Sequence, residues 1–89
     1  MSDEIRAGKP SEQLARLGLE LPAVAKPLAA YVPALRVGDQ VWTSGQLPMR
    51  EGKALYLGKV GAAVTPEQGA ECARQCALNA LAAAAGDAR

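Results

Sequence analysis

Histidine and phenylalanine are both absent from this chain of 89 residues. Without histidine, the chain has no imidazole base, no histidine metal ligand and no Cys–His dyad of its own. The aromatic side chains are Tyr31, Trp42 and Tyr56, too few for a platform on which nucleic-acid bases stack. Much of the apolar content is alanine, which buries little area per residue. We therefore expect that self-association or further chain is needed to complete a core.

Charge of one sign and long apolar runs are also scarce. The net charge is +1 and the two signs are interspersed, so no basic cluster is present to neutralise a phosphate backbone. The longest apolar stretch falls well short of the roughly 20 residues that span a bilayer. The first four residues, MSDE, are acidic and are not followed by the apolar core of a signal peptide. We expect a cytoplasmic protein that binds neither nucleic acid nor a membrane.

Two cysteines, Cys72 and Cys76, are the only thiols. In a helix their Cβ atoms would lie about 5–6 Å apart, too far for an unstrained disulfide. Without histidine or further cysteines they make half a zinc site at most. The sequence predicts that both are small buried hydrophobic residues, and it predicts no metal site.

Residues 1–29 are expected to form an N-terminal extension. The first ten residues are polar, and Ser11 is a good cap for a short helix over residues 12–17 that Gly18 would end. Residues 19–29 contain two prolines, so we expect this segment to run extended over a surface.

A β-hairpin is the clearest local signal. Two β-prone runs, residues 31–37 and 40–45, flank Gly38-Asp39, a pair typical of a tight hairpin turn. Pro33 cannot donate to a ladder, so it places its strand at an edge or marks a bulge. A loop over residues 48–53 and a short third strand over residues 54–57 are expected to follow.

A long helix is predicted next. Thr65 is a good N-cap, Pro66 suits the first helical position and Gln68 completes a capping box. The helix should run to about residue 85 and end at Gly86. One apolar stripe is expected to pack on the sheet, and the polar residues should lie largely on the other side. The stripe comprises Ala70, Ala73, Ala77, Leu81 and Ala84, and the polar set comprises Glu67, Glu71, Arg74 and Gln75.

Three polar or bare positions, Ser44, Gly45 and Gln46, end the most β-prone run. They can be a strand terminus whose polar groups bond locally in a turn. They can also be a pocket wall, in which Gly45 allows close approach of a ligand and its neighbours supply donors and acceptors. The residues alone leave both interpretations open.

The run YVPALRVGDQVWTSGQLP, followed by TPEQGAECARQCALNALAAAAG, resembles the RidA/YjgF family, also called endoribonuclease L-PSP, over roughly residues 30–86. The resemblance implies an α+β chorismate-mutase-like fold and homotrimers with small-molecule pockets between subunits. It implies hydrolysis of reactive enamine or imine intermediates to a 2-keto acid and ammonia, without metal or organic cofactor. By motif match, Tyr31 would line the pocket, and Ser44, Gly45 and Gln46 would form its wall.

Residues 30–89 resemble only the N-terminal half of such a domain: a hairpin, a short third strand and one long helix. The family's second half would bring the Arg that grips the substrate carboxylate and the Glu that orients water, so no catalytic residue is assigned here. Three hypotheses stay open: an imine or enamine deaminase, a non-catalytic carboxylate-binding protein, and a truncated inactive fragment. The ribonuclease name finds no support in a chain without histidine or basic clusters.

Overall fold

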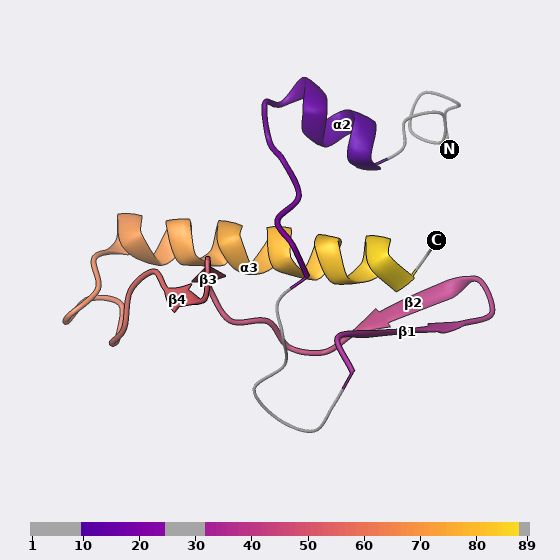
Figure 1. Ribbon diagram of the computed structural model, residues 1–89. Coiled ribbons are helices and arrows are strands. Elements are labelled where there is room, and N and C mark those ends of the chain that lie inside the picture. Colours follow the sequence, from indigo (N-terminus) through magenta and orange to yellow (C-terminus); the bar gives the residue numbers. More distant parts are fainter. Residues whose placement is uncertain (1–9, 25–31, 88–89) are drawn as a thin grey trace.

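The part of the chain that the computed structural model describes, residues 10–24 and 32–87, has an α+β architecture (Figure 1). Its elements in chain order are α2 (Pro10–Arg16), β1 (Ala34–Val37), β2 (Gln40–Thr43), β3 (Met49–Arg50), β4 (Lys53–Ala54) and α3 (Pro66–Asp87). The long helix α3 contacts β1, β2 and β3, so it organises the described part. Neither helix of this part is both long and apolar enough to cross a bilayer.

The short helix α2 confirms the helix predicted near the N-terminus, with shifted bounds. It begins at Pro10, so Ser11 lies inside the first turn rather than in the capping position. It ends at Arg16, and Gly18 follows with a φ of +73°, as expected of a helix terminator. Residues 19–24 have no regular secondary structure, and residues 25–29 of the predicted extended segment lie outside the described residues. In Figure 1, α2 lies on one side of α3 and the hairpin on the other.

Strands β1 and β2 confirm the predicted hairpin. They pair antiparallel, with Val37 opposite Gln40 and Ala34 opposite Thr43. At the turn Gly38 has a φ of +61° and Asp39 does not have a positive φ, which is the combination of a type II′ turn. The strands are shorter than predicted, because β1 begins after Pro33 and β2 ends before Ser44.

The two faces of the hairpin differ in composition. Directly opposed residues share a face, so Ala34 and Val41, both half-buried, lie on one side, and Leu35 and Trp42 lie on the other. Val37 shares the side of Leu35. We call Leu35, Val37 and Trp42 the outer face, and their exposed fractions are 57%, 54% and 61%. The larger apolar side chains of the hairpin therefore lie on its uncovered face.

A second antiparallel ribbon, β3–β4, replaces the predicted loop over residues 48–53. Met49 pairs with Ala54, and Arg50 pairs with Lys53. The turn residues Glu51 and Gly52 both have positive φ, 54° and 79°, as a type I′ hairpin requires. The predicted third strand over residues 54–57 was wrong beyond its first residue, because the Glu-Gly turn ends the pairing at Ala54.

Helix α3 begins with the predicted capping box. The Gln68 backbone N–H donates to Thr65 Oγ1 at 3.1 Å, and the Thr65 N–H donates to Gln68 Oε1 at 2.9 Å. The predicted end at Gly86 was wrong, since the helix continues through Gly86 to Asp87. A glycine inside a helix is disfavoured by only about 1 kcal/mol, so it does not by itself terminate one.

The loop before α3 packs closely on its first turns. Val60 and Val64 form an isolated parallel bridge, and Val64 is buried. Val60 lies against Gly69 of α3, where a Cβ would be 2.9 Å from its Cγ2 atom. A side chain at position 69 would therefore displace Val60, so Gly69 permits this close approach of the loop to the helix.

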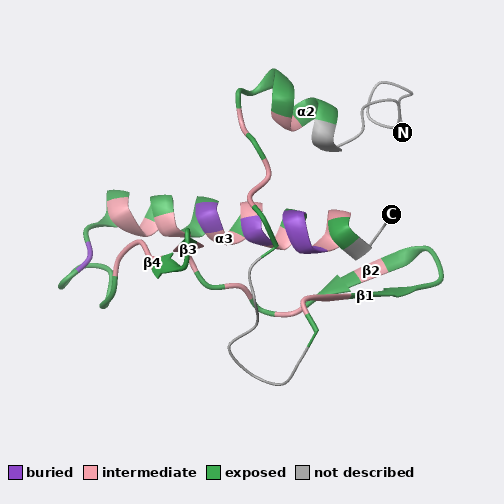
Figure 2. Ribbon diagram, viewed as in Figure 1, coloured by how far each residue is buried: buried purple, intermediate pink, exposed green. Residues whose placement is uncertain are grey.

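The predicted orientation of α3 was wrong. Ala70, Ala73, Ala77 and Leu81 are exposed, and of the predicted stripe only Ala84 is half-buried. The buried residues of the helix are Gln75, Asn79, Ala82 and Ala83 (Figure 2). Apolar periodicity identified a stripe, but it could not show that two amide side chains would be drawn inward by backbone groups of another segment.

Candidate small-molecule site

The segment that links the hairpin to the β3–β4 ribbon, residues 44–48, contains three of the four residues predicted to line a pocket. Ser44 prolongs the hairpin, because its N–H donates to the Pro33 carbonyl at 3.0 Å. The Ser44 hydroxyl donates to the same oxygen at 3.3 Å and is half-buried. This is the local bonding expected of a strand terminus. Ser44 thus anchors the near end of the segment to the hairpin.

Gly45 lies in the open. It is exposed, and apart from its neighbours Ser44 and Gln46 no described residue has a heavy atom within 4 Å of the position that its Cβ would occupy. Its φ is not in the left-handed region, so the backbone here does not demand glycine. A side chain at position 45 would fill open space without disturbing the described part of the chain.

Gln46 and its neighbours carry hydrogen-bonding groups that the described residues leave free. The Gln46 side-chain amide is half-buried and donates to the Ser44 carbonyl at 3.5 Å, a long bond. The backbone N–H groups of Gly45, Gln46 and Leu47 meet no acceptor among residues 10–24 and 32–87. A ligand carboxylate would accept from such groups in charge-assisted hydrogen bonds.

Tyr31, the fourth predicted residue, lies outside the described residues. The structure therefore brings Ser44, Gly45 and Gln46 together in one segment and does not place Tyr31 relative to them. The prediction for that tyrosine stays a prediction.

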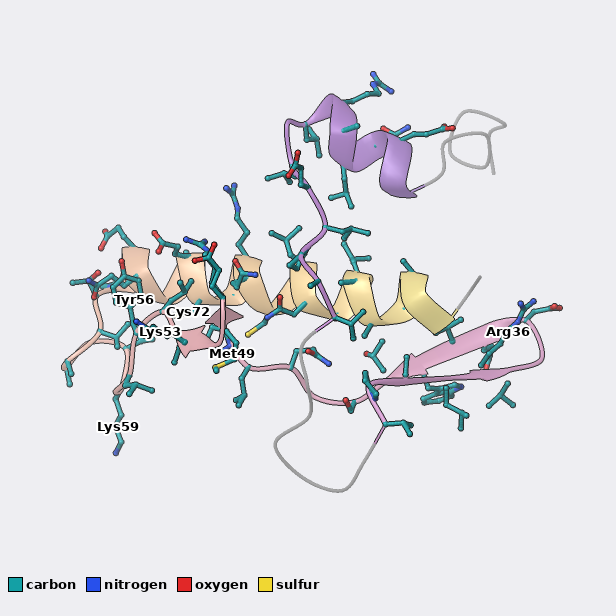
Figure 3. The ribbon with its side chains drawn as sticks, in the orientation of Figure 1. Arg36, Met49, Lys53, Tyr56, Lys59 and Cys72 are labelled. Atoms are coloured by element: carbon teal, nitrogen blue, oxygen red, sulfur yellow. The ribbon has the colours of Figure 1, made fainter. Side chains whose placement is uncertain are left out.

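Helix α3 holds the far end of the segment through a polar seam, which we define as Arg50, Gln75 and Asn79. The Asn79 amide nitrogen donates to the Leu47 carbonyl at 2.9 Å and to the Met49 carbonyl at 3.0 Å. Gln75 Nε2 donates to Asn79 Oδ1 at 2.9 Å, and Arg50 Nε donates to Gln75 Oε1 at 3.1 Å. Asn79 is 1% exposed and Gln75 is 4% exposed. Met49 lies below α3 in Figure 3.

The seam was missed by the sequence analysis, which placed Gln75 on the solvent side of the helix. A signal was nevertheless present. Gln75 and Asn79 are four residues apart in an alanine-rich helix, so they share a face, and Asn79 is the only asparagine of the chain. Two amides at this spacing are consistent with a buried hydrogen-bonded pair as well as with a solvated face.

The cysteines are free thiols, and both are half-buried rather than part of a core. Burial, and to a smaller extent the neighbouring Cys72, raises the pKa of the Cys76 thiol above its ordinary value. Cys76 is therefore protonated at neutral pH and is a poor nucleophile. Figure 3 shows Cys72 on the N-terminal half of α3.

The chemistry around the segment is recognition rather than proton transfer. The described side chains that bond to its backbone belong to Gln46 and Asn79, both uncharged at neutral pH. Within the described ranges, no group of three or more Asp, Glu or Cys side chains could hold a metal ion. The segment can hydrogen-bond a ligand, but it presents no acid or base of its own.

Comparisons with known proteins agree on one family. The sequence pattern of the family described as "YjgF/chorismate mutase-like, putative endoribonuclease" matches residues 11–88. Among curated proteins, "Protein TCP17" of Trypanosoma cruzi is 38% identical over 77 residues, which are 86% of this chain and 48% of that protein.

Solved structures show the same fold. A crystal structure described as that of "a putative endoribonuclease" from Shewanella oneidensis is 45% identical to this chain, with a TM-score of 0.76. The match covers 85% of this chain and 50% of that one. The protein Atu1372 of Agrobacterium tumefaciens, described as of unknown function, is 36% identical with a TM-score of 0.66, over 86% of this chain and 46% of that one. The chain thus spans about half the length of the relatives that it matches.

Proposed function

Because the chain belongs to the YjgF/chorismate mutase-like family, we propose that residues 44–47 form one wall of a small-molecule pocket that binds a carboxylate. The observation that carries the proposal is the row of backbone N–H groups at Gly45, Gln46 and Leu47 without a described acceptor. Donors left without a partner on burial are costly, so a ligand or a neighbouring chain that covers this segment should satisfy them.

The reaction that fits such a ligand is hydrolysis of a reactive enamine or imine to a 2-keto acid and ammonia. The segment would bind the carboxylate shared by substrate and product, which aligns the carbon that water attacks. The resemblance places the Arg that grips this carboxylate and the Glu that orients water in the family's second half. Binding can be supported by the described residues, whereas turnover would depend on that half.

A non-catalytic binding protein is the second candidate, and the uncharged surroundings of the segment favour it for this chain alone. Ammonia release from an enamine substrate separates the two candidates: a deaminase accelerates it, and a binding protein does not. The ribonuclease activity named in the family description has no support in a chain of net charge +1 without histidine.

The proposed pocket lies between subunits of a homotrimer, in keeping with the surface of the protomer. The outer face is apolar, and none of the described residues covers it, a property typical of surfaces that bind another chain. We propose that this face lies in the subunit interface and that a neighbouring subunit supplies the opposite wall.

Replacement of Gly45 tests the proposal. Gly45→Val places a branched side chain in the open space beside the free N–H groups, where the protomer itself tolerates it. We expect the parent protein to bind pyruvate, the simplest 2-keto acid, and the variant to lose at least about tenfold in affinity. The circular dichroism spectrum should stay close to that of the parent.

Leu57→Val is a matched control, because it also changes an exposed apolar position but lies away from the segment. It should bind pyruvate like the parent. If Gly45→Val keeps the affinity of the parent, the segment is only a turn.

A further inference from the structure

Asn79 is the most completely buried side chain of the described part, and every hydrogen-bonding group of its amide is used. Both donors go to carbonyls of another segment, at 2.9 Å for Leu47 and 3.0 Å for Met49. Its oxygen accepts from Gln75 at 2.9 Å. A buried amide that is fully satisfied in this way holds its partners in one arrangement.

Only one orientation of the two side-chain amides is consistent with all the hydrogen bonds of the seam. An arginine side chain can only donate, so the Gln75 oxygen must face Arg50. The Gln75 nitrogen then faces the Asn79 oxygen, and the Asn79 nitrogen must face the two carbonyls, which only accept. A flip of either amide would oppose two acceptors or two donors. The network therefore fixes the donors of Asn79 against the segment.

These bonds fix the far end of the candidate wall. The carbonyls that Asn79 holds flank Pro48, and the Met49 N–H donates to the Leu47 carbonyl at 2.7 Å in a tight turn around that proline. The near end is held by the bonds from Ser44 to the Pro33 carbonyl. Between these two anchors lie the N–H groups of Gly45, Gln46 and Leu47, for which the described residues provide no acceptor.

We infer that Asn79, oriented by Gln75, is a positioning residue that sets the placement of the free N–H groups for the ligand. The inference rests on the proposed carboxylate site, because this placement matters only if those groups meet a ligand. Asn79 touches no ligand itself and acts through the Leu47 and Met49 carbonyls. Asn79 lies on α3 and the candidate wall follows β2, so Asn79 links ligand binding to the packing position of the helix.

The test uses Asn79→Asp, which has nearly the same shape but loses the two N–H donors. Amide hydrogen exchange separates positioning from general stability, because the two ends of the segment have different anchors. The Met49 N–H should exchange at least about tenfold faster in the variant, and the Ser44 N–H should be unchanged. Pyruvate affinity should fall by about tenfold. Equal acceleration at Met49 and Ser44, or no change at Met49, would overturn the inference.

Gln75→Met is the matched control. It removes the link to Arg50 and the bond to the Asn79 oxygen but leaves both Asn79 donors in place. Because Asn79 keeps both donors and loses only the bond that orients it, Met49 exchange and pyruvate affinity should change in the same direction as in Asn79→Asp but by a smaller factor, about threefold. A loss as large as that of Asn79→Asp would mean that the helix contact, and not the two donors, determines the placement.

A measurement on the parent protein covers the case in which Asn79→Asp does not fold. Asn79 is the only asparagine, so selective ¹⁵N labelling gives a single side-chain amide signal. Both of its protons should exchange at least about 100-fold more slowly than those of free asparagine, because both are buried and bonded. Rapid exchange of either proton would overturn the inference.

The two proposals fail separately. If the parent protein does not bind pyruvate, the proposed function fails, while the exchange rates of Met49 and Ser44 still decide whether Asn79 positions the segment. If the parent binds and Asn79→Asp binds equally well, the carboxylate site stands and the positioning role of Asn79 is wrong.

Discussion

The seam and the outer face of the hairpin reverse the usual relation between polarity and burial. In the seam, the amides of Gln75 and Asn79 are almost completely buried. On the outer face, Leu35 and Trp42 are more than half exposed. A folded chain that stands alone normally places apolar side chains inside and polar ones outside. The difference shows which contacts the described residues complete among themselves and which apolar surface they leave uncovered.

The seam is stable within one protomer because its polar groups satisfy one another and the Leu47 and Met49 carbonyls. Buried polar groups are tolerated when each has its partner. Nothing in the described residues covers the outer face, and the exposed alanines of α3 add further apolar surface on the helix. The buried apolar residues are Val64, Ala82 and Ala83, a small core for the described part. Burial of the outer face, as in the proposed subunit interface, should therefore contribute much of the stability.

The largest effect is expected from a charge on the outer face. Trp42→Lys should dissociate the assembly, because an aromatic side chain at the centre of an interface often contributes 2 kcal/mol or more, about 30-fold in affinity. Sedimentation at micromolar concentration should show the parent as an oligomer and the variant as a monomer of about 9.2 kDa. Leu57→Lys is the control, since Leu57 is 81% exposed but lies outside the outer face. A parent protein that is a stable folded monomer would show that the outer face needs no second chain to cover it.

A smaller effect is expected from the seam. Asn79→Ala leaves the Leu47 and Met49 carbonyls and the Gln75 amide without a partner, and should lower the free energy of unfolding by about 2–3 kcal/mol. Urea unfolding followed by circular dichroism measures the change. Ala77→Ser on the exposed side of α3 should stay within about 0.5 kcal/mol of the parent. Similar losses in the two variants would show that the seam is no more stabilising than the solvent side of the helix.

The helix cap should contribute less than the seam. Thr65→Ala removes the acceptor of the Gln68 N–H at an exposed helix end, so the free energy of unfolding should fall by about 1 kcal/mol. The same urea experiment measures it, with Thr65→Ser as the control that keeps the hydroxyl. A loss equal to that of Asn79→Ala would mean that α3 depends on its own terminus rather than on its contact with residues 47–50.

Local features were predictable from the sequence because they depend on neighbouring residues. The hairpin turn at Gly38-Asp39 and the capping box of Thr65 and Gln68 have short-range chemistry that the residue types specify. The β3–β4 ribbon was missed because Glu51 adopts a positive φ, which is uncommon for this residue type and becomes visible only in the structure.

The side of α3 that is buried was not predictable in the same way. Periodicity groups Ala70, Ala73 and Ala77 on one side, but the buried side is decided by partners distant in the sequence. Asn79 finds the carbonyls of Leu47 and Met49, about thirty residues earlier, and this long-range pairing outweighs the small burial gain of alanine. The site residues were proposed from the motif, and the free N–H groups beside Gly45 became apparent only when the bonds of the segment were known.

The smallest effect is expected from the thiol next to the seam. Burial raises the pKa of Cys76, so the folded protein holds its proton more tightly than the unfolded chain does. The stabilisation is fully present below the pKa of an unfolded thiol, about 8.5, and is lost as the pH rises through the folded value. Between pH 8 and pH 10 the urea midpoint of the parent should therefore fall more than that of Cys76→Ser. Since burial is the first cause and Cys72 the second, Cys72→Ser should keep most of this pH dependence. A Cys72→Ser variant whose midpoint follows that of Cys76→Ser would mean that charge repulsion between the thiols, and not burial, raises the pKa.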